Sequence, residues 1–456
     1  MSEFSNLRVV VVGLGISGFA AARALIALGA HVRVTESGTG GEIDARAAAL
    51  SDDGAEVETG GHDLEGLDGD LAVVSPGIPP HAPVIRALEE SGLQIISEVE
   101  LAFRVTTCDF LAVTGTNGKT TTTSLLAEIL QEGGVRATAA GNIGVPLVDA
   151  VRTMGPGDAV ALEVSSFQLA KIDRFRPRVA VLLNVAEDHT DWHGSFEAYA
   201  AAKARILMNQ TAGDAFVVNA DDPVAMAIAQ EAPGRVIPFS ALRVPEEGIG
   251  VAEGYIVHGG RRVLAVDELP LPGIAGLEDV AAASAAAIEY GVEPEAVARA
   301  AKAFRPLHHR LEIVAEIGGV SYINDSKATN PHATLTAVRG LSDVVLIAGG
   351  RSKGIDLMPL ADTVPPVVAV VALGEAAAEV ESIFAPLVPV ARVTSMDEAV
   401  DAARTYAKRA GSVLLSPGCA SLDMFKNYAQ RGEAFERAVR AAIARDARGR
   451  ERTNGE

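Results

Sequence analysis

Residues 110–124, FLAVTGTNGKTTTTS, contain the most informative pattern in the chain. A short apolar run is followed by a glycine-rich loop and then by an amphipathic stretch that predicts a helix over 124–131. A strand, a glycine loop and a helix in this order form a phosphate-binding loop, because the free N–H groups and the dipole at a helix N-terminus favour anions. The pattern predicts a nucleotide site in an α/β sheet.

Two side chains of this loop carry chemistry. Lys119 is placed to reach the β- and γ-phosphates of a bound nucleotide, and Thr120 is placed to hold Mg²⁺ through its hydroxyl. Val113 stands where the strict phosphate-loop spacing has its first glycine. A chance match is the alternative interpretation, and the flanking strand and helix argue against it.

A similar pattern lies nearer the N-terminus, in VVVVGLGISG at residues 9–18. The apolar stretch 9–30 is long enough for a membrane span, but Arg23 and the glycines favour a strand, a turn and a helix over 19–28. Glu36 ends the next predicted strand, where an acid binds the ribose in a dinucleotide fold. Tight packing of strand against helix, without a ligand, is the alternative for these glycines.

Short apolar runs alternate with helical stretches along the whole chain, which predicts parallel sheets. The 456 residues allow three domains of roughly 150 residues each. We predict an α/β protein with three domains, each with a mostly parallel sheet flanked by helices: 1–106, 107–308 and 309–446, followed by a solvated tail, 447–456. The predicted strands are 9–12, 32–35, 71–74, 110–113, 159–164, 179–183, 216–219, 320–323, 344–348, 367–372 and 413–415.

Composition restricts the classes of function. With 48% apolar and 21% charged residues the chain is globular, and overall disorder is excluded. The 39 Lys and Arg against 59 Asp and Glu give a net charge of -20, the wrong sign for gripping nucleic acid or anionic lipid. Cys108 and Cys419 have no CxxC partner, so neither a disulfide framework nor a thiolate metal site is expected. We expect a cytoplasmic protein.

Polar side chains follow two predicted strands of the second domain. Glu163 lies in EVSSFQL and His189 in NVAEDHTDWH, and strand ends of an open α/β sheet converge on one crevice. A carboxylate and an imidazole beside a phosphate loop suit Mg²⁺ or Mn²⁺. For His189 alone, a surface or core histidine is the alternative.

Polar clusters also follow the strands of the third domain. Asp325, Lys327 and Thr329 follow one strand, while Lys353 and Ser421 follow two others. Each could be a cap or a turn, because such residues favour those places. Together the two lysines would suit an acidic substrate.

Taken in order, these motifs resemble the Mur ligases of peptidoglycan synthesis, and within them the type that adds glutamate to UDP-N-acetylmuramoyl-L-alanine. The resemblance covers nearly the whole chain. Its motifs are GLGISG at 13, GTNGKT at 115, GNIG at 141, EVSSFQL at 163, NVAEDH at 184, AAKARI at 201, HHRLE at 308, NDSKATN at 324 and CASLDMFKN at 419.

The resemblance implies a set of contacts for each substrate. For ATP it implies Gly115, Thr116, Asn117, Gly118, Lys119, Thr120, Thr121, Arg310 and, at the ribose, Asp325. For the UDP-substrate it implies Ile16, Ser17, Glu36, Ser37 and Gly77 around the UDP part, and Asn142, Ser165, Gln168 and His189 near the muramoyl-alanine part. For the incoming glutamate it implies Lys327, Thr329, Lys353, Ser421 and Tyr428.

The resemblance also implies metal ions and a reaction. Two Mg²⁺ ions, replaceable by Mn²⁺, would be held by Thr120, Glu163, His189 and Lys203. Lys203 matches the lysine that the family carbamylates with CO₂, which turns a cation into an anionic metal ligand. Lys119 completes the implied catalytic set. ATP would phosphorylate the alanine carboxylate, and the amine of glutamate would attack the acyl phosphate as the three domains of a monomer close together.

The chain departs from the family pattern in a few places. Ala275, Gly276 and Asp279 stand where the family commonly has a His-Asn pair and a second Asn near adenine. Gly38 replaces an Arg on the uracil side, and Tyr428 stands where Phe is frequent. No residue distinguishes D-glutamate from L-glutamate as the substrate.

Other interpretations explain fewer of the motifs. A nicotinamide-dependent dehydrogenase would account for GLGISG and Glu36 but would leave Lys119, Glu163 and Lys203 unused. A folylpolyglutamate synthase or another Mur ligase would share the central loop but would need a different first domain or glutamate pocket. A non-catalytic sensor of UDP-sugars would have no use for Lys119, Glu163, His189 and Lys203.

Overall fold

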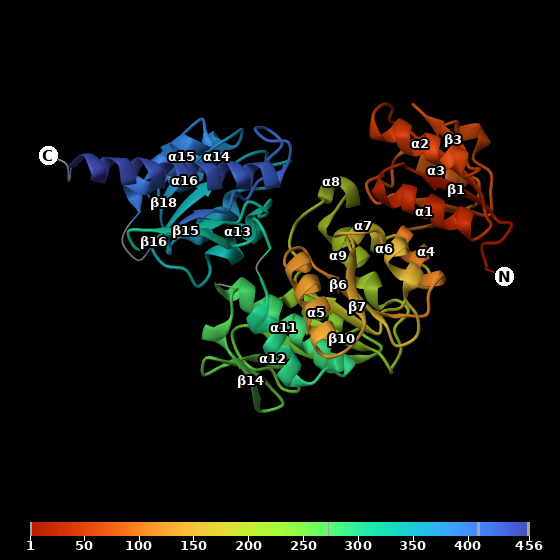
Figure 1. Ribbon diagram of the computed structural model, residues 1–456, viewed down its shortest axis with the longest axis horizontal. Coiled ribbons are helices and arrows are strands. Elements are labelled where there is room, and N and C mark those ends of the chain that lie inside the picture. The colour runs from red at the N-terminus through yellow and green to blue at the C-terminus, as the bar shows by residue number, and fades with distance from the viewer. Residues whose placement is uncertain (1, 272, 306, 408–410, 454–456) are drawn as a thin grey trace. The chain divides into compact units, whose positions relative to one another are not determined.

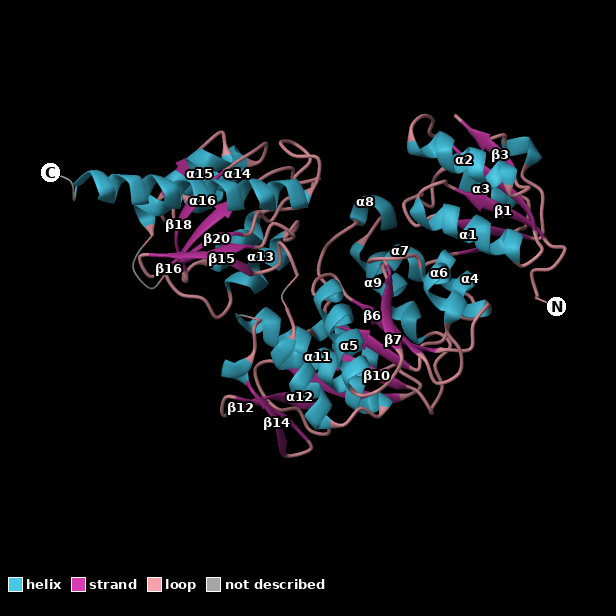
Figure 2. Cartoon of the chain, in the orientation of Figure 1, coloured by secondary structure: helices cyan, strands magenta, loops and turns pink. Residues whose placement is uncertain are grey.

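The computed structural model describes residues 2–271, 273–305, 307–407 and 411–453. These residues form three domains, each with its own sheet flanked by helices (Figures 1 and 2). The chain divides into two compact units, the first made of 1–185, 189–264 and 279–301, the second of 186–188, 265–278 and 302–456. The predicted α/β class is thereby confirmed, and the domain limits stay a prediction.

The first sheet has five parallel strands in the order β3 (Glu56–Thr59), β2 (His31–Glu36), β1 (Arg8–Val12), β4 (Leu71–Val74) and β5 (Gln94–Ile96). Residues 9–12 of β1 and the whole of β4 are runs of buried apolar residues, as expected where helices cover both faces. The strand order reverses between β1 and β4, which places a ligand crevice at their carboxyl ends. The helices are α1 (Ile16–Ala27), α2 (Glu42–Asp52), α3 (Pro83–Glu90) and α4 (Glu98–Arg104).

The second sheet has nine strands, in the order β14 (Arg261–Ala265), β13 (Tyr255–His258), β12 (Ile249–Ala252), β11 (Arg235–Ser240), β10 (Ala215–Asn219), β9 (Val179–Leu182), β6 (Asp109–Thr114), β8 (Ala159–Glu163) and β7 (Ala137–Gly141). In this sheet order, all neighbouring strands between β12 and β7 pair in parallel, and β13 is antiparallel to β12. The helices are α5 (Lys119–Glu132), α6 (Leu147–Ala150), α7 (Ser166–Leu169), α8 (Thr190–His193), α9 (Phe196–Ala204), α10 (Pro223–Ala229), α11 (Gly273–Tyr290) and α12 (Pro294–Ala303).

The third sheet has six strands, in the order β15 (Glu312–Ile317), β16 (Val320–Asn324), β20 (Ser412–Leu415), β17 (Val344–Ala348), β18 (Val367–Ala372) and β19 (Val390–Arg392), with only β15 antiparallel to its neighbour. Along β17, Leu346 packs into one apolar cluster while Val345 and Ile347 pack into another, so both faces are buried. The helices are α13 (Pro331–Val338), α14 (Ala377–Phe384), α15 (Met396–Tyr406) and α16 (Tyr428–Thr453).

Two sequence predictions are refined by these bounds. Helix α16 continues to Thr453, through most of the segment 447–456 that the sequence indicates as a tail, because its Arg, Ala and Glu residues favour helix without any apolar face. The apolar stretch 9–30 is divided between β1, the glycine loop, α1 and the turn that precedes β2. Within the described residues, no helix combines the length and the apolar character that crossing a membrane requires.

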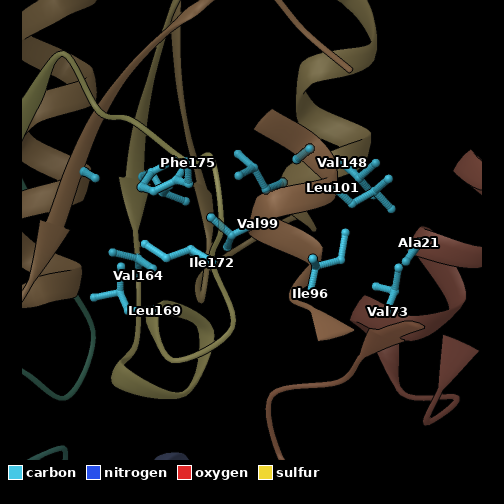
Figure 3. Close-up of a cluster of buried hydrophobic side chains, with 14 of the residues drawn as sticks. Ala21, Val73, Ile96, Val99, Leu101, Val148, Val164, Leu169, Ile172 and Phe175 are labelled. Carbon is cyan, nitrogen blue, oxygen red and sulfur yellow. The ribbon is translucent and has the colours of Figure 1, made fainter. Parts of the chain in front are cut away.

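One apolar cluster joins the first sheet to the second domain. Ala21 on α1, Val73 on β4 and Val99 on α4 contribute to it from the first domain, and Val148 on α6 and Phe175 before β9 contribute from the second (Figure 3). All five side chains are buried. The first two domains therefore share part of one hydrophobic core.

Glu98, at the start of α4, is a buried carboxylate at this junction. Its Oε1 accepts a hydrogen bond from Val148 N–H at 2.6 Å. Burial raises the pKa of Glu98 to about 7, and the nearby Asp149 contributes in the same direction. The charged form of this residue therefore destabilises the folded chain.

We expect Glu98→Gln to raise the free energy of unfolding at about pH 8 by up to about 3 kcal/mol. The folded state binds this proton more tightly than the unfolded chain, where the pKa is 4.5. The contribution of Glu98 to stability is therefore complete below about pH 4.5 and is lost as the pH rises to about 7. Glutamine keeps the acceptor for Val148 N–H and carries no charge.

Urea unfolding at about pH 8 and about pH 5 measures this effect. The gain should shrink toward the lower pH. Glu90→Gln, which changes an exposed glutamate on α3, is the matched control and should have no effect at either pH. An equal gain for Glu98→Gln at both pH values would contradict an ionisation cost.

Candidate functional site

The glycine loop after β1 is held by the carboxylate of Glu36. Its Oε2 accepts a hydrogen bond from Leu14 N–H at 2.6 Å, and its Oε1 accepts one from Gly38 N–H at 2.7 Å. Burial raises the pKa of Glu36, but these hydrogen bonds outweigh burial, so the pKa lies below its ordinary value. Gly18 approaches Gly13 O so closely that a side chain at Gly18 would clash. Glu36, at the end of β2, is thus an anion that binds the loop after the neighbouring strand β1.

The other predicted UDP contacts lie along the same sheet edge. Ile16 is exposed at the start of α1, next to Ser17, while Ser37 follows β2 and Gly77 lies in the loop after β4. Strands β2, β1 and β4 are neighbours, so the loops at their carboxyl ends face one crevice. The loops lie at the expected sheet edge, and the role of each residue stays a prediction.

The phosphate loop connects β6 to α5, as the sequence predicts. Gly115 and Gly118 have positive φ angles of 156° and 84°, which side chains disfavour. Lys119 Nζ donates hydrogen bonds to Gly115 O at 2.9 Å and to Thr116 O at 2.8 Å. The amine therefore lies across the loop that it is predicted to serve, with Thr120 and Thr121 in the same first turn of α5.

Asn184, two residues beyond β9, fixes this loop from the neighbouring strand. Its Oδ1 accepts hydrogen bonds from Thr116 N–H at 3.1 Å and Asn117 N–H at 2.8 Å. The asparagine belongs to the NVAEDH motif, but its place in the sequence does not indicate this role. Only the pairing of β6 with β9 brings it to the loop.

Lys203 reaches the same loop from α9. Its side chain is 1% exposed, and its Nζ donates a hydrogen bond to Gly115 O at 2.7 Å. The amine lies 4.5 Å from the centre of the Tyr199 ring, whose hydroxyl is 3.0 Å from Thr116 Oγ1. The structure therefore brings Lys203 together with Lys119 at one carbonyl, although 84 positions separate them in the chain.

Glu163 and Asn142 meet at the ends of β8 and β7. Asn142 Nδ2 donates a hydrogen bond to Glu163 Oε1 at 2.9 Å. Glu163 Oε2 is buried and has no hydrogen-bond partner within the described part of the chain. A buried carboxylate oxygen without a hydrogen-bond donor destabilises the folded state, and a bound cation would remove this cost.

His189 and the SSFQ segment form the next part of the predicted substrate site. His189 precedes α8 with a positive φ of 53°, and its ring lies 4.8 Å from that of Phe167. Ser165 and Gln168 form a capping box on α7: Gln168 N–H donates to Ser165 Oγ at 3.3 Å, and Ser165 N–H donates to Gln168 Oε1 at 2.9 Å. Both side chains are buried, so the segment is held rigidly, and its contact with substrate stays a prediction.

Asp279 lies beside the phosphate loop. Its Oδ1 accepts a hydrogen bond from Thr122 Oγ1 at 2.9 Å, and it lies so close to Gly118 that a side chain there would clash. Ala275 and Gly276 lie in the first turn of the same helix, α11. The departure from the family pattern therefore places a carboxylate at the start of α5.

In the second unit, backbone hydrogen bonds connect three loops at the carboxyl edge of the third sheet. Gly418 N–H donates to Ala328 O at 3.1 Å, and Arg351 and Ala420 exchange two hydrogen bonds of 2.8 and 2.9 Å. These loops carry four of the predicted glutamate contacts, namely Lys327, Thr329, Lys353 and Ser421. The four residues therefore lie on adjoining segments.

Lys327 and Tyr428 are in direct contact. Lys327 Nζ lies 3.8 Å from the centre of the Tyr428 ring, which is within the range of a cation–π interaction. Ser326 Oγ donates a hydrogen bond to Tyr428 O at 2.7 Å. The ring therefore orients the ammonium group that is predicted to bind glutamate.

Asp325 is buried under these loops. Its Oδ2 accepts a hydrogen bond from Ser416 Oγ at 2.9 Å, and its Oδ1 accepts one from Leu311 N–H at 3.3 Å. Burial raises the pKa of Asp325 to about 7, while Arg310 acts in the opposite direction. Arg310 lies between His309 and Leu311, whose φ angles are both positive, so the backbone on each side of it is strained.

Arg431 on α16 binds two of the loops that carry the predicted glutamate contacts, and no local sequence pattern indicates it. Its guanidinium donates to Ser326 O at 2.8 Å and to Cys419 O at 3.0 Å. The side chain is buried, and burial lowers its pKa to about 10. A buried arginine bound to two carbonyls fixes the positions of both loops.

Three family models match successive parts of the chain. They are a Mur ligase MurD-like N-terminal domain over residues 7–97, a Mur ligase middle domain over 113–287 and a Mur ligase glutamate ligase domain over 309–419. Their order along the chain is the order of the three sheets.

The chain is also similar to curated proteins over nearly its full length. It is 46% identical to the UDP-N-acetylmuramoylalanine--D-glutamate ligase of Frankia casuarinae, covering 96% of this chain and 95% of that protein. It is 40% identical to the ligase of the same name from Caldanaerobacter subterraneus subsp. tengcongensis, covering 96% and 99%. The solved UDP-N-acetylmuramate-alanine ligase of Thermotoga maritima shares the fold, with a TM-score of 0.57 and 19% identity over 96% of this chain and 100% of that one. Since the family models and these relatives together span the chain, it belongs to the Mur ligase family.

Proposed function

We propose that the chain is an ATP-dependent ligase that joins D-glutamate to UDP-N-acetylmuramoyl-L-alanine, a cytoplasmic step of peptidoglycan synthesis, and acts as a monomer. The names of its curated relatives support the acceptor and the D-glutamate. The geometric observation that carries the proposal is the hydrogen bonding of Lys119 Nζ and Lys203 Nζ to the same Gly115 O, at 2.9 and 2.7 Å. A phosphate loop joined by a second, buried lysine fits phosphoryl transfer to a carboxylate.

The proposed reaction has two steps. An oxygen of the alanine carboxylate attacks the γ-phosphorus of ATP, the bond from that phosphorus to the β,γ-bridging oxygen breaks, and ADP leaves. The amine of glutamate then attacks the acyl carbon, the C–O bond to phosphate breaks, and the nitrogen loses a proton. Lys119 and the N-terminus of α5 offset the negative charge of the transferred group.

Thr120, Glu163, His189 and Lys203 as a carbamate are proposed to hold two Mg²⁺ ions, which Mn²⁺ can replace. The buried and unsatisfied Oε2 of Glu163 fits such a ligand set, because a carboxylate oxygen without a donor favours a cation. Bound Mg²⁺ supplies positive charge between the ATP phosphates and the acceptor carboxylate. The amine of Lys203 lies beside the phosphate loop, where a carbamate formed from CO₂ would face the same ions.

The remaining substrates are proposed to bind at the two other sheet edges. The crevice of the first sheet, with Glu36 at its loop, would take the UDP part. The loops of the third sheet would take glutamate, with Lys327 and Lys353 facing its carboxylates.

An amino-acid panel tests this function. Purified chain, UDP-N-acetylmuramoyl-L-alanine, ATP and Mg²⁺ are mixed with each amino acid in turn, and phosphate release is measured. Release is expected with D-glutamate and not without the UDP-substrate. Release with L-glutamate but not with D-glutamate would show that the substrate is L-glutamate. No release with any amino acid, together with substrate-dependent oxidation or reduction of a nicotinamide cofactor, would overturn it.

A further inference from the structure

A group of metal-ligating side chains lies in the second unit and includes none of the predicted substrate contacts. His308 and Glu312 come from the segment that enters β15, and Glu436 comes from α16. One ligand atom of each lies within 4.8 Å of the other two. His308 Nδ1 is 3.1 Å from Glu312 Oε1. An imidazole and two carboxylates from distant parts of the chain thus converge on one point.

Neighbouring groups hold the two carboxylates in place. His309 N–H donates a hydrogen bond to Glu312 Oε2 at 3.0 Å, which leaves Oε1 on the side of His308. Asn324 is fully buried, and its Nδ2 donates to Glu436 Oε1 at 3.0 Å. Metal ligands in proteins are typically oriented by such outer hydrogen bonds, which reduce the entropy lost when an ion binds.

The segment itself is fixed against α16. The ring of His309 lies so close to Gly432 that a side chain at Gly432 would clash with it. Asn324 Nδ2 also donates to Gly432 O at 3.3 Å. The glycine therefore lets the segment that carries His308 and Glu312 approach the helix that carries Glu436.

We propose that His308, Glu312 and Glu436 bind a divalent transition-metal ion of the Zn²⁺ class. One imidazole nitrogen with carboxylate oxygens suits Zn²⁺, and no nucleotide phosphates lie here to supply the further oxygen ligands that Mg²⁺ needs. His308 is 84% exposed, so the ion is accessible from solvent, and water would complete its coordination. Glu436 Oε2 lies 3.8 Å from Arg440 Nη2, so that carboxylate is partly neutralised already. Binding would offset the remaining negative charge and would tie the start of β15 to α16, elements that already pack together.

Calorimetric titration of the metal-free full chain with ZnCl₂, in the absence of nucleotide, tests the proposal. Wild type is expected to bind one Zn²⁺ per chain more than His308→Ala. Glu436→Gln should weaken this site by about tenfold or more. His81→Ala, which removes an exposed histidine of the first domain, is the matched control and should titrate as wild type. Any Zn²⁺ that binds near Glu163 and His189 would bind equally to wild type and to the three variants, so it would cancel in the comparison of their stoichiometries.

Equal stoichiometry and affinity for wild type and His308→Ala would overturn the proposal. A second readout does not depend on counting ions. Zn²⁺ should slow amide hydrogen exchange in β15 and in the part of α16 around Glu436 in wild type, and should leave His308→Ala unchanged. The same slowing in both proteins, or none in either, would count equally against the site.

Discussion

Lys119→Ala is expected to lower kcat by about a thousandfold and to leave the affinity for UDP-N-acetylmuramoyl-L-alanine nearly unchanged. The amine lies on the phosphate loop, 2.9 Å from Gly115 O and 2.8 Å from Thr116 O. Its removal takes positive charge away from the place where the phosphoryl group would be transferred. The predicted uridine contacts lie on a different sheet, so binding of the UDP part should not depend on this lysine.

Steady-state kinetics and direct binding of the UDP-substrate measure the two effects separately. The matched control is Lys302→Ala, which removes a partly exposed lysine on α12 that pairs with Glu268 at 2.7 Å. It should retain the wild-type kcat. A loss of UDP-substrate affinity as large as the loss of kcat in Lys119→Ala would contradict the division of roles between the first two sheets.

Lys203→Ala is expected to lose activity by about a thousandfold and to recover part of it in acetate or another short carboxylic acid. The side chain is 1% exposed, so its removal leaves a space beside the phosphate loop. A small carboxylate can enter that space and supply the anionic oxygen that a carbamate would provide. Rates measured against acid concentration test the recovery.

Lys203→Arg tests whether the carbamate, rather than a positive charge at this position, is needed. Arginine keeps a cation near Gly115 O but does not form the carbamate, and it fills the space that acetate needs. It should be inactive and should not be rescued. A carbon-13 NMR signal from labelled CO₂ should appear in wild type and be absent from both variants. Substantial activity of Lys203→Arg, or no carbamate signal in wild type, would remove the carbamate from the proposal.

Strands that are unbroken apolar runs are predicted well from the sequence. The predicted ranges 71–74, 344–348 and 367–372 have the same bounds in the structure, because every residue in them is buried or nearly so between turn residues. Parallel strands that are covered on both faces have no solvent-facing polar residues to interrupt the apolar run.

Strands near the sheet edges are not predicted. β3 reads EVET and β7 reads ATAAG, and neither contains an apolar run. Their strand conformation comes from pairing with β2 and β8, which are already ordered. The helix starts are also missed: α1 begins at Ile16 and α5 at Lys119, before the apolar spacing of either helix begins.

The loops of the candidate site are predicted because glycines, lysines and acids directly follow strands. The residues that hold those loops are missed for a single reason. Asn184 meets Asn117 across 67 positions of sequence, and Arg431 meets Ser326 across 105. Such partners are defined by tertiary contacts alone, and no local pattern indicates them.

The core shared by the first two sheets decides how this chain can be divided for expression. A fragment that stops at residue 106 would contain Ile96, Val99 and Leu101 without the partners that Val148 and Phe175 provide (Figure 3). The cut would leave a contiguous apolar patch on its surface, and such patches favour aggregation. Nucleotide-binding studies on an isolated first domain would therefore need a fragment that also includes the second sheet.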